Sequence, residues 1–281
     1  MRHYLYKFTV MTSPCEVHIY HQDGILAQKL ASDILVRAKA LEKKYNFYDP
    51  HSLLSQINQR KVKQLDRETK ELLHRAKLFY AKSEGVFDVT MGTLVASRRH
   101  ASVEAVEEAV ARLIPFVGVE HFKLQRDQIQ FDNPYTQIDF GGLVKEYAVD
   151  QAVKILKKAK VTSALVNFGG DIYALGEKPK GDPFVIGIKN PHDPRRYIAQ
   201  VPLKNRALTT SASYERNRQI EDRNYSHIIG TAPLQSRVIS ATVLAPSVVE
   251  SGVFSTALMI KPSLRLPFEK LLIDEDLVIH H

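Results

Sequence analysis

Residues 137–150 carry the side chains with the clearest chemical use. They read Q-I-D-F-G-G-L-V-K-E-Y-A-V-D, and a second Gly-Gly pair, followed by Asp171, occurs at residues 169–171. Adjacent glycines let a backbone come close to a ligand, and a helix that starts after them offers unpaired N–H groups to a phosphate. Asp139 can accept a hydrogen bond from a ribose or a ring N–H, and Lys145 adds a positive charge. The pattern indicates a nucleotide site, and a tight strand-to-helix turn with a solvated lysine is the open alternative.

Two further segments combine polar and aromatic groups. Residues 85–90 read G-V-F-D-V-T, so Asp88 could hold a polar ligand while Phe87 offers a flat apolar surface. The alternative is a helix that ends at a glycine and continues as a turn. Residues 47–52 read F-Y-D-P-H-S, which could place the ring of Tyr48 against a heterocycle or form an ordinary X-Pro turn with a helix cap. Neither segment alone decides between a binding site and a turn.

Hydroxyl and imidazole side chains occur in the second half of the chain. Residues 209–214 concentrate small hydroxyls after an expected strand, which suits an anion or a turn. His227 lies in a strand-like run, where a lone histidine is more often structural than catalytic. The eleven histidines include no H-E-x-x-H pattern, and the single cysteine, Cys15, cannot supply a cysteine cluster. The pattern therefore argues against an ordinary zinc centre.

Composition indicates a soluble globular protein with a preference for anions. The chain has 281 residues, of which 44% are hydrophobic and 25% charged, and its net charge is +8. Such a charge suits a nucleotide, a nucleic acid or a membrane surface without choosing among them. The basic residues are scattered, which argues against dedicated nucleic-acid binding. We find no apolar leader and no run of about 20 apolar residues, so we expect a cytoplasmic protein with no membrane span, and the oligomeric state stays open.

Periodicity predicts an α+β fold. Helical spacing occurs at residues 27–45, 69–83, 103–113, 143–159 and 248–260, with Ser102 as a possible N-cap. Strands are expected at residues 4–10 and 16–20, with a turn at Ser13 and Pro14 between them. Further strands are expected at residues 122–131, 136–140, 164–167, 184–189, 198–203, 208–211, 225–229 and 237–244. Sequential strand pairs with grouped helices favour α+β over regular βαβ alternation.

Taken in order, these segments resemble the FAD:protein FMN transferase family of the ApbE type. Nine motifs in register carry the resemblance, at residues 11–12, 48–52, 85–90, 139–145, 164–172, 187–191, 210–211, 225–229 and 255–258. The resemblance implies a single domain over residues 1–281, with T-fold-related mixed sheets, packed helices and a central cleft. It also implies FAD in that cleft, a magnesium ion near the pyrophosphate, and transfer of FMN to a threonine of an acceptor flavoprotein with release of AMP.

The resemblance also implies roles for particular residues. The expected FAD contacts are Met11, Tyr48, Val86, Phe87, Asp88, Asp139, Lys145 and Ile229. The backbone carbonyl of Gly142 and the hydroxyl of Thr256 are expected to face the magnesium ion. We assign candidate catalytic roles to His227 and Thr256.

Several positions depart from the family pattern, among them Thr231, which stands in place of a proline. Gly252 stands where the family has an acid that binds magnesium, Gly230 replaces a second acid, and Glu146 stands where the family usually has glycine. An acid and a threonine four residues apart share a helix face and can chelate one ion. We therefore expect weak magnesium binding, and we expect Gly252→Asp to strengthen it. A catalytically impaired flavin-binding, nucleotide-binding or interaction protein is the second interpretation, and a nucleic-acid-binding protein that reuses the fold is the third.

Overall fold

The computed structural model describes residues 1–95, 102–193, 195–213, 217–220, 223–226 and 237–281. The chain divides into two compact units. The first unit comprises Met1–Lys43, Gly142–Ala212 and Arg237–His281, and the second comprises Lys44–Gly141 and Ser213–Ser236. The expectation of one domain over residues 1–281 stays a prediction.

The first unit is built on an eight-stranded sheet in which all paired neighbours are antiparallel. In spatial order its strands are β1 (Arg2–Val10), β2 (Ser13–His21), β5 (Ala164–Phe168), β6 (Asp171–Leu175), β9 (Arg206–Ala212), β12 (Val238–Ala245), β13 (Glu269–Asp274) and β14 (Ile279–His280). A separate hairpin, β7 (Phe184–Lys189) with β8 (Tyr197–Leu203), shares an apolar cluster with β6, β9, β12 and β13.

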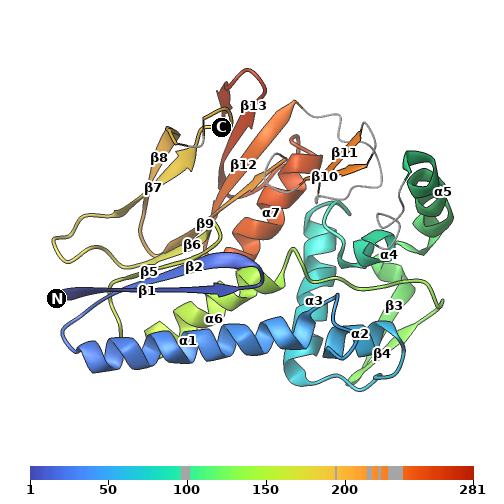
Figure 1. Cartoon of the computed structure of the whole chain (residues 1–281), viewed down its shortest axis with the longest axis horizontal. Coiled ribbons are helices and arrows are strands. Elements are labelled where there is room, and N and C mark those ends of the chain that lie inside the picture. Colours follow the sequence, from blue (N-terminus) through green and yellow to red (C-terminus); the bar gives the residue numbers. More distant parts are fainter. Residues whose placement is uncertain (96–101, 194, 214–216, 221–222, 227–236) are drawn as a thin grey trace. The chain divides into compact units, whose positions relative to one another are not determined.

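In the described part of the first unit, three helices accompany this sheet. They are α1 (Gly24–Tyr45), whose last two residues belong to the second unit, α6 (Val144–Lys158) and α7 (Val248–Ile260). Helix α6 packs against β5 and β6, while α7 packs against β9 and β12 (Figure 1). The backbone N–H groups of Val248 and Val249 donate to the carboxylate of Asp150 in α6, at 2.9 and 3.2 Å. A side chain of one helix therefore satisfies the unpaired donors at the start of the other.

The second unit is mainly helical. Its elements are α2 (Leu53–Asn58), α3 (Arg67–Lys82), η1 (Val89–Met91), α4 (Gly92–Val95), α5 (Val103–Leu113), η3 (Ile114–Phe116), η4 (Val119–His121), and the hairpins β3 (Phe122–Gln125) with β4 (Gln128–Phe131) and β10 (Asn217–Ile220) with β11 (Arg223–Ser226). Side chains of Ser52, Asp66 and Ser102 cap α2, α3 and α5 by accepting from backbone N–H groups. These local hydrogen bonds define where each helix begins.

The structure confirms most of the expected elements. The helices at residues 103–113 and 248–260 and the strand at residues 184–189 have the predicted bounds, and Ser102 is the N-cap. The turn predicted at Ser13 and Pro14 is wrong, because these residues begin β2 and the turn is formed by Met11 and Thr12. Both turn residues have positive φ, 52° and 58°. Such turns are usually recognised in a sequence by glycine or asparagine, and this one contains neither.

The strand predicted at residues 136–140 is also wrong. This segment is extended, but side chains take the hydrogen bonds that a neighbouring strand would make. Asn58 exchanges two hydrogen bonds of 2.8 Å with the backbone of Ile138, and the N–H of Gln137 donates to Thr93 Oγ1 at 3.0 Å. The apolar alternation was real, since Ile138 and Phe140 are buried, yet it did not require a sheet.

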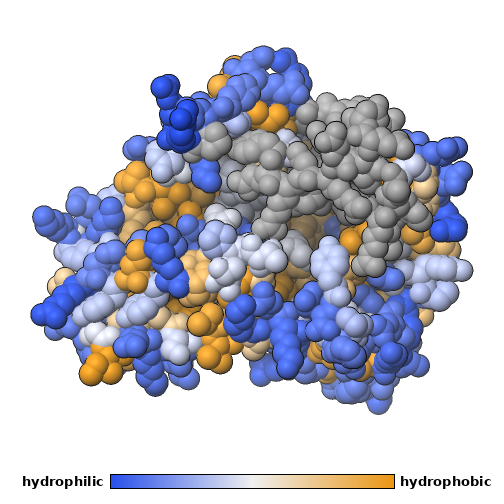
Figure 2. Space-filling model, viewed as in Figure 1, coloured by the Kyte–Doolittle hydropathy of each residue, from blue (hydrophilic) through white to orange (hydrophobic). Residues whose placement is uncertain are grey.

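Within the described part of the chain, no helix is long and apolar enough to cross a bilayer. Figure 2 shows hydrophilic side chains over much of the displayed face, with apolar side chains in smaller patches among them. The cytoplasmic location expected from the sequence stays a prediction.

Cys15 tests how closely β2 is packed. Its side chain is 1% exposed, and burial raises the pKa of the thiol to about 11. We expect a thiol reagent such as DTNB, at mildly alkaline pH, to label the folded chain far more slowly than the chain unfolded in guanidinium chloride. Rapid, stoichiometric labelling of the folded protein would contradict the buried position.

Candidate functional site

In the second unit, two segments that are remote in sequence meet beside the expected site residues Asp88 and Asp139. The backbone N–H of Asp139 donates to the carbonyl of Val89 at 2.8 Å. Gly92 permits this approach, because a Cβ there would lie 2.8 Å from the Gln137 carbonyl oxygen and 3.0 Å from Asp139 Cβ. The structure therefore brings together two motifs that the sequence could only list separately.

Both carboxylates in this region are held by hydrogen bonds. Asp88 Oδ1 accepts from the backbone N–H and the hydroxyl of Thr90, each at 2.7 Å, and Asp139 Oδ1 accepts from the N–H of Gly141 at 2.8 Å. Burial raises the pKa of Asp88 and of Asp139, and these hydrogen bonds oppose the shift. Each side chain is thus a fixed group that can accept a hydrogen bond from a polar ligand.

The aromatic candidates of the second unit differ in their exposure. Phe87 is 8% exposed, and its ring packs edge-on against Phe79 with 6.5 Å between centroids. It therefore offers little of the flat surface that the sequence suggested. Tyr48 is 69% exposed, and Val86 follows Gly85, whose φ of 81° lies in the left-handed region after the end of α3. The turn interpretation of both segments is locally correct, and the FAD contacts of Tyr48, Val86 and Phe87 stay predictions.

In the first unit, the two glycine motifs meet at Lys145. The ammonium of Lys145 lies 2.6 Å from the carboxylate of Asp171, which directly follows the second Gly-Gly pair. A Cβ at Gly169 would lie 2.9 Å from Ser13 Cβ and 3.8 Å from Lys145 Nζ, and the φ of Gly169 is 61°. This close approach requires glycine. Sequence reasoning noticed Asp171 but missed its partner, because strand pairing and the path of α6 bring them together.

Glu146, the residue after Lys145, is buried at 7% exposure and faces α7. A Cβ at Gly252 would lie only 2.4 Å from Glu146 Cγ, so the two positions compete for the same space. Burial raises the pKa of Glu146, the Asp171 carboxylate acts in the same direction, and Lys145 opposes them. The expectation that Gly252→Asp alone would strengthen metal binding therefore needs correction, since the new side chain would overlap Glu146.

The remaining candidates of the first unit occupy helix and turn positions. Thr256 lies on α7 with its hydroxyl 3.2 Å from Ser211 Oγ, and Gly142 is exposed two residues before α6 begins. Met11 lies in the turn between β1 and β2, where its N–H donates to Glu42. His227 and Ile229 lie outside the described residues. Among the residues that the structure describes, no group of three His, Cys, Asp or Glu side chains is arranged to hold a metal ion.

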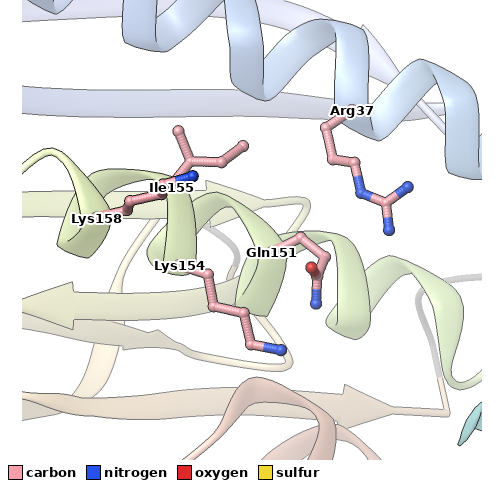
Figure 3. A pocket seen from close by; sticks show the side chains of 5 residues that line it. All are labelled: Arg37, Gln151, Lys154, Ile155 and Lys158. Carbon is pink, nitrogen blue, oxygen red and sulfur yellow. The ribbon is translucent and has the colours of Figure 1, made fainter. Parts of the chain in front are cut away.

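A small groove between α1 and α6 is a separate feature of the first unit. It is lined by Arg37, Gln151, Lys154, Ile155 and Lys158 and encloses about 160 Å³ (Figure 3). Figure 3 shows Arg37 reaching from α1 toward α6. Ligand pockets usually enclose about 300–1,000 Å³, so this groove is too small for a dinucleotide. None of its residues belongs to the motifs described above.

Comparison with known proteins gives a consistent result over nearly the whole chain. The model of the ApbE family matches residues 11–266. A curated FAD:protein FMN transferase from Vibrio cholerae is 26% identical over 264 residues, which cover 89% of this chain and 79% of that protein. One from Klebsiella pneumoniae is 25% identical over 193 residues, which cover 64% of this chain and 55% of that protein. The matched part thus spans about half the length of some curated relatives.

Solved structures share the fold. The crystal structure of an ApbE protein from Thermotoga maritima superposes with a TM-score of 0.88 at 25% identity, covering 100% of this chain and 97% of that one. The flavin transferase ApbE from Vibrio cholerae superposes with a TM-score of 0.85 at 24% identity, covering 99% and 96%. The expected α+β architecture of mixed sheets and packed helices is therefore confirmed.

The contact between Gly252 and Glu146 can be tested by a double-mutant cycle. Gly252→Ala should destabilise the wild-type chain by about 1–3 kcal/mol, because the added methyl group overlaps Glu146 Cγ. In a Glu146→Ala background the same change should be neutral or stabilising by up to about 1 kcal/mol, since alanine favours the helix. Denaturant unfolding of the four proteins measures the coupling. Equal effects in the two backgrounds would show that the side chains do not compete.

Proposed function

Because the chain belongs to the ApbE family, we propose that it is an FAD:protein FMN transferase. In this reaction the threonine hydroxyl of an acceptor protein attacks the phosphorus on the FMN side of the FAD pyrophosphate. The P–O bond to AMP breaks, AMP leaves, a phosphoester bond to threonine forms, and the hydroxyl proton is released. The match over residues 11–266 is the observation that carries this proposal.

The charge arrangement of the first unit supports it. Phosphoryl transfer needs alignment and charge neutralisation more than covalent chemistry from the enzyme. Lys145 Nζ lies 3.8 Å from the position that a Cβ of Gly169 would take, and its pairing with Asp171 holds the ammonium in place. We therefore propose Lys145 as a phosphate-binding cation.

The proposed FAD contacts keep the assignments made from the sequence. Asp88 and Asp139 are the strongest of these, because both are polar groups fixed by hydrogen bonds at the meeting point of two motifs. The complete set is Met11, Tyr48, Val86, Phe87, Asp88, Asp139, Lys145 and Ile229. His227 and Thr256 remain the proposed catalytic residues.

A magnesium ion suits the oxygen donors of the first unit. Mg²⁺ prefers hard oxygen ligands and usually binds at least one carboxylate. The Gly142 carbonyl and the Thr256 hydroxyl are the proposed ligands. The same unit also contains a buried carboxylate oxygen, Glu146 Oε2, that has no hydrogen-bond partner among the described residues. A bound ion would help neutralise the pyrophosphate charge. The transferase needs such help, whereas a catalytically impaired flavin-binding relative would not.

The transferase activity can be measured directly. We expect the protein, incubated with FAD, magnesium and a threonine-bearing acceptor peptide, to release AMP and to attach FMN covalently to the peptide. Chromatography with absorbance detection would quantify AMP, and mass spectrometry would locate the flavin. A peptide with alanine in place of the threonine is the matched control. FAD binding without AMP release would favour the impaired interpretation, and salt-sensitive binding to nucleic acid without any flavin effect would favour the third.

Asp139 tests the FAD site independently of turnover. Asp139→Ala should weaken FAD binding by about 1.5–3 kcal/mol, because a buried hydrogen bond to a charged group is lost. Flavin fluorescence titration measures the dissociation constant. The control is Glu71→Ala, which removes an exposed carboxylate from α3. An unchanged dissociation constant for Asp139→Ala would remove this residue from the site.

A further inference from the structure

Glu146 is buried, and one of its two carboxylate oxygens, Oε2, has no hydrogen-bond partner among the described residues. Its side chain is 7% exposed, and Oε2 accepts no hydrogen bond from any residue that the structure describes. A buried carboxylate without a hydrogen bond or a cation is strongly destabilising. Such a group persists in a folded protein when it takes up a proton or when a bound cation satisfies it.

The neighbouring charged groups do not supply that cation. Lys145 precedes Glu146, but its ammonium pairs with Asp171 at 2.6 Å. Asp150, one turn further along α6, is used to cap the start of α7. In the part of the chain that the structure describes, Lys145 and the N–H groups at the start of α7 thus bind other carboxylates, which leaves Glu146 Oε2 available to a bound cation.

Other oxygen donors lie on the elements that flank Glu146. Its side chain faces Gly252 of α7, and Thr256 lies one helical turn further along the same face. Gly142 lies four residues before Glu146, shortly ahead of α6, at an exposed position. A carboxylate, a hydroxyl and a backbone carbonyl are the hard donors that Mg²⁺ binds, with water completing its coordination.

We propose that Glu146 supplies the carboxylate ligand of a magnesium site that also uses Thr256 and Gly142. The inference deepens the proposed transferase function and rests on it. In this site the carboxylate belongs to α6. Gly252 of α7 provides no ligand, and its missing side chain leaves room for Glu146.

The contact between the two helices gives this assignment its physical basis. An acid at position 252 and Glu146 cannot coexist without movement, because a Cβ at 252 would come within 2.4 Å of Glu146 Cγ. Glycine at 252 is therefore what allows the Glu146 carboxylate to lie against α7. One carboxylate can reach this region from either helix, and in this chain α6 provides it.

Binding of Mn²⁺, measured by electron paramagnetic resonance, tests the proposal without any turnover. Mn²⁺ replaces Mg²⁺ at oxygen sites, and free Mn²⁺ gives a signal that is lost on binding. We expect the wild-type protein to bind one Mn²⁺, displaceable by Mg²⁺, and the titration is run without FAD and with saturating FAD. Failure of the wild type to bind Mn²⁺ in both conditions would overturn the proposal.

Substitutions then identify the ligand. Glu146→Gln keeps the side-chain shape and should weaken Mn²⁺ binding by about tenfold or more, since even indirect changes at metal sites cost about 10–100-fold. Glu269→Gln removes an exposed carboxylate with the same change in charge and should bind as the wild type does. Equal Mn²⁺ affinity of Glu146→Gln and wild type would show that Glu146 is a structural group only.

The reciprocal exchange guards against loss of folding. The double variant Glu146→Gly, Gly252→Asp moves the carboxylate to α7 and removes the overlap, so it should regain Mn²⁺ binding that Glu146→Gly alone lacks. If the double variant melts at the wild-type temperature and still does not bind Mn²⁺, the proposal that positions 146 and 252 can supply the same carboxylate ligand would be overturned. Because these titrations need no acceptor and no AMP release, a negative transferase assay with intact Mn²⁺ binding would reject the proposed function and leave the metal ligand standing.

Discussion

Three carboxylates of the first unit, those of Glu146 and Asp150 in α6 and Asp171 at the start of β6, are partly or fully removed from solvent. Charged groups are buried only when partners compensate for lost solvation. Asp150 is compensated by the unpaired N–H groups of α7, and Asp171 by the ammonium of Lys145. Among the described residues, Glu146 Oε2 has neither a hydrogen bond nor an ion pair, and this oxygen is the basis for proposing a bound cation.

Close backbone approach is what makes these pairings possible. Gly169 brings the turn between β5 and β6 against Ser13 and toward Lys145, and Gly252 leaves room on α7 for Glu146. In each case a methyl group would come nearer than 3 Å to a neighbouring atom. The two glycines therefore matter because they have no side chain: each leaves room for a neighbouring residue, Ser13 at Gly169 and Glu146 at Gly252.

In the second unit, hydrogen bonds hold the residues of the candidate site in place. Asn58 and Thr93 hold the extended segment before Asp139, and the Val89 carbonyl receives the Asp139 N–H. The result is a carboxylate with a defined position at a junction of two motifs. Such preorganisation reduces the ordering that binding would otherwise require.

The amino-acid sequence by itself determined the helices, their caps and most of the strands, because these depend on neighbours within a few residues. The sequence also determined the family, because the motifs occur in the same order even though the chain is only 26% identical to a curated relative. Periodicity did not reveal strand β6, because all five of its residues are buried and no alternation marks it, and residues 136–140 imitated a strand while bonding to side chains. Only the tertiary structure decided that Lys145 meets Asp171 and that Glu146 meets Gly252, since these partners are far apart in the chain and the packing of α6 against the sheet and α7 brings them together.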